Sequence, residues 1–586
     1  MTYLKQSHIS IDTPMAPPAW ALMEWELIRT QERACTEFFE KYFDERGYLE
    51  CIPRWGGNDG PDDAIENLVN WPVLYLLGGC DDLRAMCELG WEGHLRQYTE
   101  AKTTEVPFAR DGMYYREFPV MFDWVHNGEG LTTFNLHGLM DPTPREFENR
   151  VRRFAGFYMG DDPQSPNYDK EHKIIRSLIN GSRGPMLRKA TALDWAGDPL
   201  DEVEERYIPL HGERNFEEML AHFEDYTDVA GDHPSNMVAT TLGLNAFALT
   251  GEGSYRDWVL EYAEAWRQRT IDNDGIIPTN IGLDGTIGGE CDGKWYGGCY
   301  GWAFTVTVPQ TGARSSRNTH YLGIAGFGNA LLFSGDQRYV DAWRQMIDKI
   351  NSHAKVVDGK QVYPHMHGDD GWYDFKESPY SAGALDVYYW SMDRDDLKRL
   401  NSDSGWVGFL EGNAAEYPVE ALQRDFGRVR GQMEKVRNDP TTPDTRLSDN
   451  PNPLNPATTG SLIELMLGGL APKHGCPLHC RLRYFDPARQ RPGMPEGVGA
   501  LIENLGADST TVTLVNTDQV AGREVIVQGG AYAEHCFDKV TIDGKETKVD
   551  GTSFAVQLAP GAGATLEIAT QRYASQPTFA FPWDRS

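Results

Sequence analysis

The sequence is poor in basic residues and lacks a long apolar run. It has 55 Lys and Arg against 87 Asp and Glu, which gives a formal net charge of −32. A surface of that sign repels nucleic acid and anionic membranes. No apolar stretch approaches the roughly 20 residues that a membrane-spanning helix needs. We therefore expect neither nucleic acid nor a membrane as a partner.

The N-terminal residues also lack the features of an export signal. No basic stretch followed by an apolar one occurs in residues 1–16. The nine cysteines are an odd number scattered over a long chain, which fits reduced thiols better than a disulfide framework. Both observations predict a cytoplasmic location. One cluster has metal-binding residue types but no second Cys/His pair at a zinc spacing: His474, Cys476, His479 and Cys480.

An internal repeat is the strongest signal that is present. Residues 251–269 and 335–350 both place Gly and an acidic residue before Tyr, Trp and aliphatic residues at helical spacing. Each copy follows an apolar helical run, and weaker echoes occur at 78–98 and 138–158. The unit is a pair of helices followed by a long loop. One pair cannot bury its apolar face alone, so the pairs must stack.

Stacked pairs can form an open solenoid or a closed ring. Long loops rich in aromatic and polar residues, such as 271–316, favour the ring, because loops at one end then line a central cleft. We predict a mainly α protein whose residues 1–490 form an (α/α) toroid of helical hairpins. A polar, Pro-rich stretch at 425–460 is expected to be an extended connection, and 461–475 a last core helix.

The pattern changes near residue 497. Period-two alternation, β-branched residues and Gly/Asp turns continue from there to about residue 570. We expect residues 491–586 to form a small antiparallel β-sandwich with a C-terminal tail.

This arrangement resembles the (α/α) toroid glycoside hydrolases and polysaccharide lyases. The late segment AVQLAPGAGATLEI is similar to the last strands of sandwiches attached to glycosidases. The resemblance covers nearly the whole chain, at the level of architecture. It implies a carbohydrate-active enzyme that acts on an oligosaccharide or polysaccharide and needs no cofactor or catalytic metal.

Four loops combine glycine with polar and aromatic residues, at 54–71, 114–129, 231–302 and 314–373. Glycine lets the backbone turn sharply while aromatic rings remain free to stack on sugars. Asp123, His126 and Glu129 have the spacing of one helical face. The expected substrate-binding residues are Trp55, Asp59, Arg116, Glu117, Asp123, His126, Glu129, Asp284, Trp295, His320 and Trp372.

Two chemistries compete at these loops. A lyase that cleaves beside a uronic acid needs a donor for the carboxylate, a base and an acid. Toroid lyases use Asn, His, Tyr and Arg for these tasks, and this chain offers them in a similar order. The predicted activity is therefore β-elimination on imported uronic-acid oligosaccharides, from a chain end. The expected catalytic residues are Asn236, His233, Tyr296, Tyr300, His365 and Arg317.

A glycoside hydrolase with two carboxylates is the alternative. Its candidates are Asp59, Asp62, Asp63, Glu117, Asp123, Glu129, Asp284 and Glu290. Each of these residues also has a structural interpretation, as a helix cap or a packed side chain. His365, His367 and Asp369 form a possible metal set without an identified further ligand. A helical-repeat scaffold that binds another protein is disfavoured by the long, aromatic loops.

Overall fold

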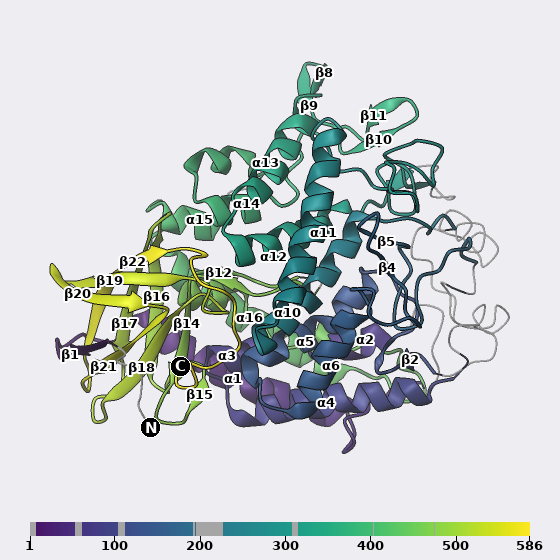
Figure 1. The fold of residues 1–586 in the computed structure, drawn as a ribbon. Coiled ribbons are helices and arrows are strands. Elements are labelled where there is room, and N and C mark those ends of the chain that lie inside the picture. The colour runs from purple at the N-terminus through teal and green to yellow at the C-terminus, as the bar shows by residue number, and fades with distance from the viewer. Residues whose placement is uncertain are drawn as a thin grey trace.

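A computed structural model describes residues 7–52, 61–102, 110, 112–191, 194, 227–307, 314–401, 404–473 and 475–585. Helical hairpins form the larger part of the molecule, and a β-rich part lies beside them (Figure 1). Within the described ranges, no helix combines the length and the apolar character needed to cross a membrane.

The two strong repeats form equivalent helical hairpins. Helix α10 (Thr240–Thr250) leads into α11 (Gly253–Asp272), and α12 (Ile324–Ser334) leads into α13 (Arg338–Asn351). Gly251 and Gly335 end the first helix of each pair with φ of 72° and 64°. Their N–H groups donate to carbonyls four residues back, at Phe247 and Leu331, which is the left-handed helix end that glycine favours. The predicted repeat is confirmed.

The weaker echoes are hairpins as well. Helix α3 (Trp71–Leu77) pairs with α4 (Asp81–Glu100). Helix α5 (His126–Met140) meets α6 (Arg145–Gly156) through Phe134, whose ring lies 5.3 Å from that of Phe147 and 4.9 Å from that of Phe154. The first helices of successive hairpins lie side by side, in the order α3, α5, α10 and α12. A short 3₁₀ helix precedes each of the last two: η3 (Pro234–Ala239) before α10 and η4 (His320–Gly323) before α12.

The connection predicted at 425–460 is wrong in its first part. Helix α16 (Tyr417–Asn438) continues through residues 425–438 and packs on α1 (Ala19–Tyr42). Gly427 and Gly431 obscured this helix in the sequence. Arg, Lys, Glu, Gln and Met favour helix enough to span them, and apolar residues such as Val429 and Met433 are buried. The last core helix predicted at 461–475 is present only in its first half, as α17 (Gly460–Leu462) and a π-helical turn (Ile463–Leu467), and strand β12 (Gly469–Leu470) follows.

The C-terminal residues form two five-stranded sheets. In pairing order, the first sheet contains β1 (His8–Ile11), β21 (Ser553–Leu558), β18 (Arg523–Gly529), β14 (Leu482–Asp486) and β15 (Arg491–Pro492). The second contains β16 (Val498–Leu505), β17 (Ser509–Asn516), β22 (Gly563–Gln571), β19 (Cys536–Ile542) and β20 (Lys545–Gly551). The two sheets face each other, since Phe537 of β19 packs on Phe554 of β21 with ring centroids 5.4 Å apart.

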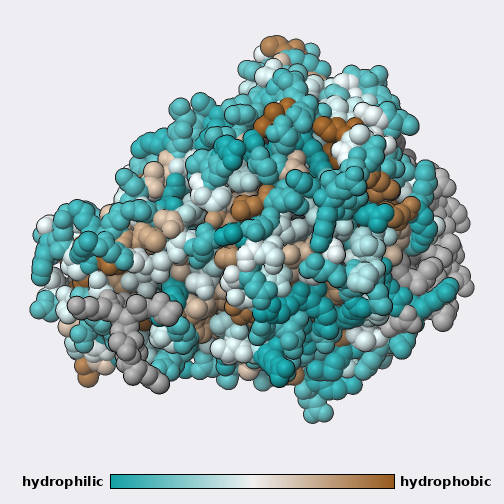
Figure 2. All heavy atoms as spheres, viewed as in Figure 1, coloured by the Kyte–Doolittle hydropathy of each residue, from teal (hydrophilic) through white to brown (hydrophobic). Residues whose placement is uncertain are grey.

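The β-rich part draws on strands outside residues 491–586. Strand β14 precedes that range, and β1 comes from the opposite end of the sequence to pair in parallel with β21, His8 opposite Ala555. The first described strand, β1, and the last, β22, consequently both lie in the β-rich part of the molecule (Figure 1). On the face shown in Figure 2, hydrophilic residues predominate among the coloured atoms, and hydrophobic ones form small scattered groups.

Candidate active site

Five ionisable side chains from one short helix and from the start of α5 form what we call the acidic cluster: Asp62, Glu66, Asp123, His126 and Glu129. Asp62 and Glu66 lie one turn apart on α2 (Pro61–Glu66), which packs against the first turns of α5. The close approach depends on Gly130, where an added Cβ would lie only 3.2 Å from the Asp62 Cβ. The predicted convergence of Asp123, His126 and Glu129 is therefore joined by two further carboxyl groups.

Asp123 holds the start of α5 and the ring of His126. Its Oδ1 accepts from the backbone N–H groups of Val125 and His126, at 2.9 and 3.1 Å, and lies 2.7 Å from His126 Nδ1. Burial would raise the pKa of Asp123, but the charge and hydrogen bond of His126 hold it below its usual value. Burial would lower the pKa of His126, but Asp123, Asp62 and Glu129 raise it well above its usual value. The pair is therefore an ionised carboxylate and an imidazolium.

Glu66 is the group in the cluster most strongly shifted toward its neutral form. Burial, then the charges of Glu129 and Asp62, raise its pKa to about 9. A hydrogen bond joins the Glu66 and Glu129 carboxyl groups, and Asn452 Nδ2 donates to Glu66 Oε2 at 2.6 Å. Burial also raises the pKa of Asp62, to about 6, with His126 opposing the shift. At neutral pH the cluster thus holds a protonated Glu66 beside ionised carboxylates.

One side of the acidic cluster is accessible to solvent. The His126 side chain is 36% exposed, and Glu66 and Glu129 are half-buried. Tyr321 of η4, 38% exposed, is close enough for Glu129 to influence its ionisation. An exposed aromatic ring beside half-buried carboxyl groups is a common arrangement for holding a sugar.

A second group, which we call the aromatic loop cluster, joins the 271–316 and 351–380 loops: Trp295, Tyr296, His367, Asp369 and Trp372. His367 lies 4.7 Å from the Trp295 ring and 4.9 Å from the rings of Tyr296 and Trp372. The Tyr296 hydroxyl donates to Asp369 Oδ1 at 2.7 Å, and Lys294 pairs with the same carboxylate at 2.8 Å. The two loops therefore lie at the same end of the hairpins, as predicted.

Trp302 and His320 connect the two clusters. The rings of Trp302 and His320 stack at 3.9 Å, and Trp302 lies 6.0 Å from the Trp372 ring. His320 is the residue before Tyr321. It is buried, bonded to Asn318 and to the Tyr380 hydroxyl, and burial keeps its pKa well below the usual value. His320, predicted to bind substrate, instead positions η4 as a neutral, packed ring.

His233 and Asn236, predicted to be catalytic, lie in the interior. His233 Nδ1 accepts from the Ser235 N–H at 3.1 Å, and its Nε2 lies 3.2 Å from the Tyr300 carbonyl. Burial lowers the pKa of His233 to about 4. Asn236 is fully buried and donates to Asp232 Oδ1 at 2.9 Å and to the Ser177 carbonyl at 3.1 Å. These contacts do not fit a predicted role in binding a substrate carboxylate.

The other predicted residues are dispersed. Glu117 is paired with Arg150 and Arg153, which lower its pKa against the effect of burial, and Arg116 is paired with Asp162. Asp284 accepts from Thr286 at 2.6 Å, which lowers its pKa. His365 lies 3.1 Å from the Ser378 carbonyl. Tyr300 is buried with φ of 58°, and Arg317 is half-buried. Trp55, Asp59 and His474 lie outside the described residues.

The predicted site set omitted Glu66 and Tyr321, and held Asp62 only as a hydrolase candidate. The i, i+4 spacing of Asp62 and Glu66 was a usable signal, but the intervening residues gave little sign of a six-residue helix. No group of three or more His, Cys, Asp or Glu side chains in the described ranges is placed to hold a metal ion. The absence of a catalytic metal stays a prediction.

Solved structures similar to this chain include three carbohydrate-processing enzymes. Cellobiose 2-epimerase from Bacillus thermoamylovorans B4167 is 10% identical over 60% of this chain and 92% of its own, with a TM-score of 0.23. D-mannose isomerase is 12% identical over 66% and 100%, with a TM-score of 0.22. A GH127 β-L-arabinofuranosidase from Geobacillus stearothermophilus T6 is 11% identical over 96% and 85%, with a TM-score of 0.27. Likenesses of this size carry no argument about function.

No curated protein matches the sequence. Residues 8–365, more than half of the chain, match the family described as a domain of unknown function, DUF8034. The chain belongs to the DUF8034 family.

Proposed function

We propose that this protein is a carbohydrate-active enzyme, and specifically a glycoside hydrolase whose general acid is Glu66. The observation that carries the proposal is the packing of Glu66 against Glu129 and Asp62 in a half-open cluster, which raises the pKa of Glu66 to about 9 and favours its protonated form. Glycoside hydrolysis needs one protonated and one ionised carboxyl group at the same bond. The acidic cluster can meet this requirement, so we favour a hydrolase over a lyase.

In this reaction Glu66 and one ionised carboxylate each carry out one proton transfer. Glu66 donates its proton to the glycosidic oxygen as the bond from that oxygen to the anomeric carbon breaks. Water attacks the anomeric carbon and loses a proton to an ionised carboxylate. The hydrogen bond between Glu66 and Glu129 implies a spacing well below the roughly 6.5–9.5 Å of carboxyl pairs that leave room for an attacking water. Glu129 can therefore act as base only if the sugar displaces this bond, whereas Asp62 requires no such displacement.

The aromatic residues supply the argument for a saccharide. Tyr321 borders Glu129, and the Trp302–His320 stack leads from there to Trp295 and Trp372. The exposed Tyr321 and the half-buried Trp295 and Trp372 are rings that can stack on the apolar faces of sugars, while carboxylates hold the hydroxyls.

We also propose that the hairpins close into the (α/α) toroid. Helices α3, α5, α10 and α12 follow one another in space as in sequence. The segment before α17 returns to α3, since Trp71 Nε1 donates to Asn455 Oδ1 at 3.0 Å and Asn455 Nδ2 to the Val69 carbonyl at 2.9 Å. A ring with its long loops at one end would hold the acidic cluster and the aromatic loop cluster around one opening.

A lyase is the second candidate, favoured by one observation. The Tyr296 hydroxyl is exposed beside Lys294 and His367, so a tyrosine acid or base and a cation for a uronate lie in one loop cluster. Elimination leaves a conjugated double bond in the product, whereas hydrolysis adds water and leaves none.

The test is an oligosaccharide panel, neutral and uronate-containing, with products followed by NMR and ultraviolet absorbance. Glu66→Gln should reduce turnover by about 10²- to 10⁴-fold, the range for losing a positioned acid. Glu88→Gln is the matched control, because Glu88 on α4 is also half-buried with a raised pKa but lies outside the cluster. Comparing Asp62→Asn with Glu129→Gln identifies the base.

The pH profile gives an independent readout. Activity should fall as pH drops through about 6, where Asp62 takes up a proton, and as pH rises through about 9, where Glu66 loses its own. Ultraviolet-absorbing products, with Tyr296→Phe inactive and Glu66→Gln active, would replace the hydrolase with the lyase. Turnover of Glu66→Gln equal to wild type would refute the assignment of the acid.

A further inference from the structure

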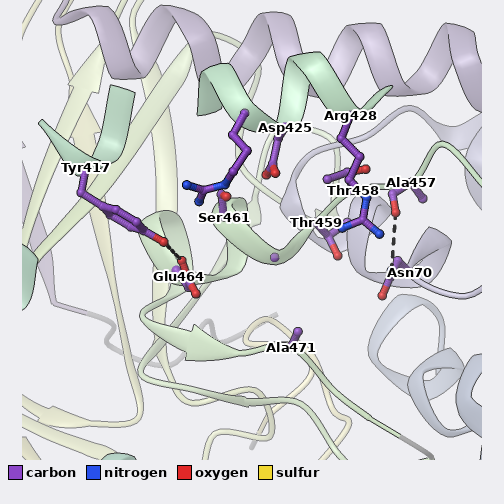
Figure 3. Close-up of a pocket in the computed structure, with 12 residues that line it drawn as sticks. Asn70, Tyr417, Asp425, Arg428, Ala457, Thr458, Thr459, Ser461, Glu464 and Ala471 are labelled. Carbon is purple, nitrogen blue, oxygen red and sulfur yellow. Dashed lines mark hydrogen bonds between the residues drawn. The ribbon is translucent and has the colours of Figure 1, made fainter. Parts of the chain in front are cut away.

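A cavity of about 300 Å³ lies between α16 and the segment 457–471, outside the acidic cluster. Figure 3 shows Asp425 and Arg428 on α16 directed toward Thr459 and Ser461 at the start of α17. Asn70, which precedes α3, forms another wall and donates to the Ala457 carbonyl at 3.4 Å. The floor continues into the π-helical turn, a distortion often found at functional sites.

Asp425 is the unusual member of this wall. Its side chain is 6% exposed, and its Oδ2 is buried without a hydrogen-bond partner in the described part of the chain. Burial raises the pKa of Asp425, and hydrogen bonding of Ser461 with the charges of Arg424 and Arg428 only partly counters this. A buried acceptor without a donor is unfavourable, so a ligand that supplies the donor should bind about tenfold or more tightly than one that does not.

Arg428 provides the complementary group. Its guanidinium is exposed and makes no hydrogen bond within the described ranges, so its five N–H donors are available. The buried Thr459 and the half-buried Asn70 add polar side chains to the same cavity. The cavity thus presents unmatched donors and an unmatched acceptor a few residues apart on one helix.

This combination selects the ligand by chemistry. A phosphate or carboxylate could pair with Arg424 and Arg428, but it offers only acceptors, leaves Asp425 Oδ2 without a donor and places a negative charge beside Asp425 and Glu464. An ammonium offers only donors and would leave Arg428 unmatched. A hydroxyl does both, and two adjacent hydroxyls can donate to Asp425 Oδ2 while accepting from Arg428.

We infer that this cavity is a second ligand site, which binds the vicinal diol of a neutral, hydroxyl-rich ring. At about 300 Å³ it lies at the lower end of ligand-pocket volumes, which fits one or two sugar rings. The site goes beyond the proposed hydrolysis and does not depend on it. The chain that leads into the segment 457–471 nonetheless contacts the acidic cluster, since Asn452 donates to Glu66.

Gly460 permits a test that leaves the fold intact. It lines the cavity, an added Cβ would meet no atom within 4 Å, and its φ lies outside the left-handed region. Gly460→Leu should fill the cavity without a clash. Gly427→Leu is the matched control, because Gly427 on α16 has the same free space but does not line the cavity.

The probes are myo-inositol and cis-1,2-cyclohexanediol, with cyclohexanol and inorganic phosphate for comparison, and binding is followed by ligand-observed NMR titration. Both diols should bind wild type, Gly427→Leu and Glu66→Gln but not Gly460→Leu, and cyclohexanol should not bind. Asp425→Asn should weaken diol binding about tenfold or more, and Arg428→Met likewise, whereas Arg430→Met, a nearby exposed arginine, should not.

Diol binding that survives Gly460→Leu would overturn the inference, as would wild type that binds no diol. Phosphate binding that Gly460→Leu abolishes, without diol binding, would make this an anion site and overturn it too. The binding titration measures no turnover, so absence of diol binding would leave the hydrolase proposal unaffected. In the same way, a failure of the hydrolase proposal would leave the proposed diol site unaffected.

Discussion

Two buried aspartates at the starts of helices differ in charge although they are equally deep. Asp123, before α5, has a pKa below its usual value because His126 is its partner. Asp232, before η3, has its pKa raised to about 7 by burial, which the more distant charge of Arg269 and the hydrogen bonds of Asn236 and Tyr262 only partly offset. The partner rather than the depth determines which carboxylate stays ionised. An ion pair at a half-open edge suits catalysis, and a closed network of neutral donors suits stability.

The largest expected effect is on stability, at the closed network. Asp232→Ala would leave four donors without an acceptor: the Tyr262 hydroxyl, the Asn236 amide and the N–H groups of Ile175 and His233. We expect the free energy of unfolding to fall by about 3–5 kcal/mol, measured by urea titration. Turnover per folded molecule should change less than severalfold. If Asp232→Ala left stability unchanged and abolished turnover, Asp232 would have a catalytic role instead of a structural one.

At the open edge, the effect should be on rate. His126→Gln removes the cation that holds Asp123 and Asp62 ionised, so turnover should fall about 10²-fold. His137→Gln is the control on the same helix, since burial keeps the pKa of His137 at about 4 and it lies outside the cluster. Equal rate losses in the two variants would show that α5 itself, and not its charge, was disturbed.

A smaller effect is expected where substrate binds without reacting. Trp372→Ala removes an aromatic face from the aromatic loop cluster, so KM should rise about tenfold with little change in kcat. Trp583→Ala, at the partly buried Trp583 in the β-rich part, is the control and should leave KM unchanged. A fall in kcat with unchanged KM would place Trp372 in the chemistry.

The smallest expected effect tests whether folding raises or lowers the pKa of Glu66. Its folded-state pKa lies above the unfolded value, so its contribution to stability is complete below about 4.5 and is lost as pH rises through about 9. Glu66→Gln, which cannot ionise, should raise the Tm by a few degrees at pH 8 and leave it nearly unchanged at pH 4. A Tm that falls at pH 8 would contradict a neutral Glu66.

The sequence predicted the regular parts of the fold well and the site only in part. Periodicity and the glycines at 251 and 335 were enough to predict the hairpins, and alternation was enough for the late strands. Asp123, His126 and Glu129 were found because one helix turn brings them together. The contact of Glu66 with these residues depends on the packing of α2 against α5, and the burial of Asn236 depends on the packing around η3. Spacing along the chain predicts neither of these two features.

The parallel pairing of β1 with β21 has a consequence for how the chain is made. Residues 8–11 cannot form their strand pairing until residues 555–558 have been synthesised, and α1 cannot pack on α16 and β16 until those elements have been made. During synthesis Phe38 can pack early on Trp71 of α3, but the part of α1 that contacts α16 and β16 stays uncovered while some four hundred residues follow. Ribosome-bound intermediates of this protein should accordingly engage chaperones early, at its first helix, and release them late.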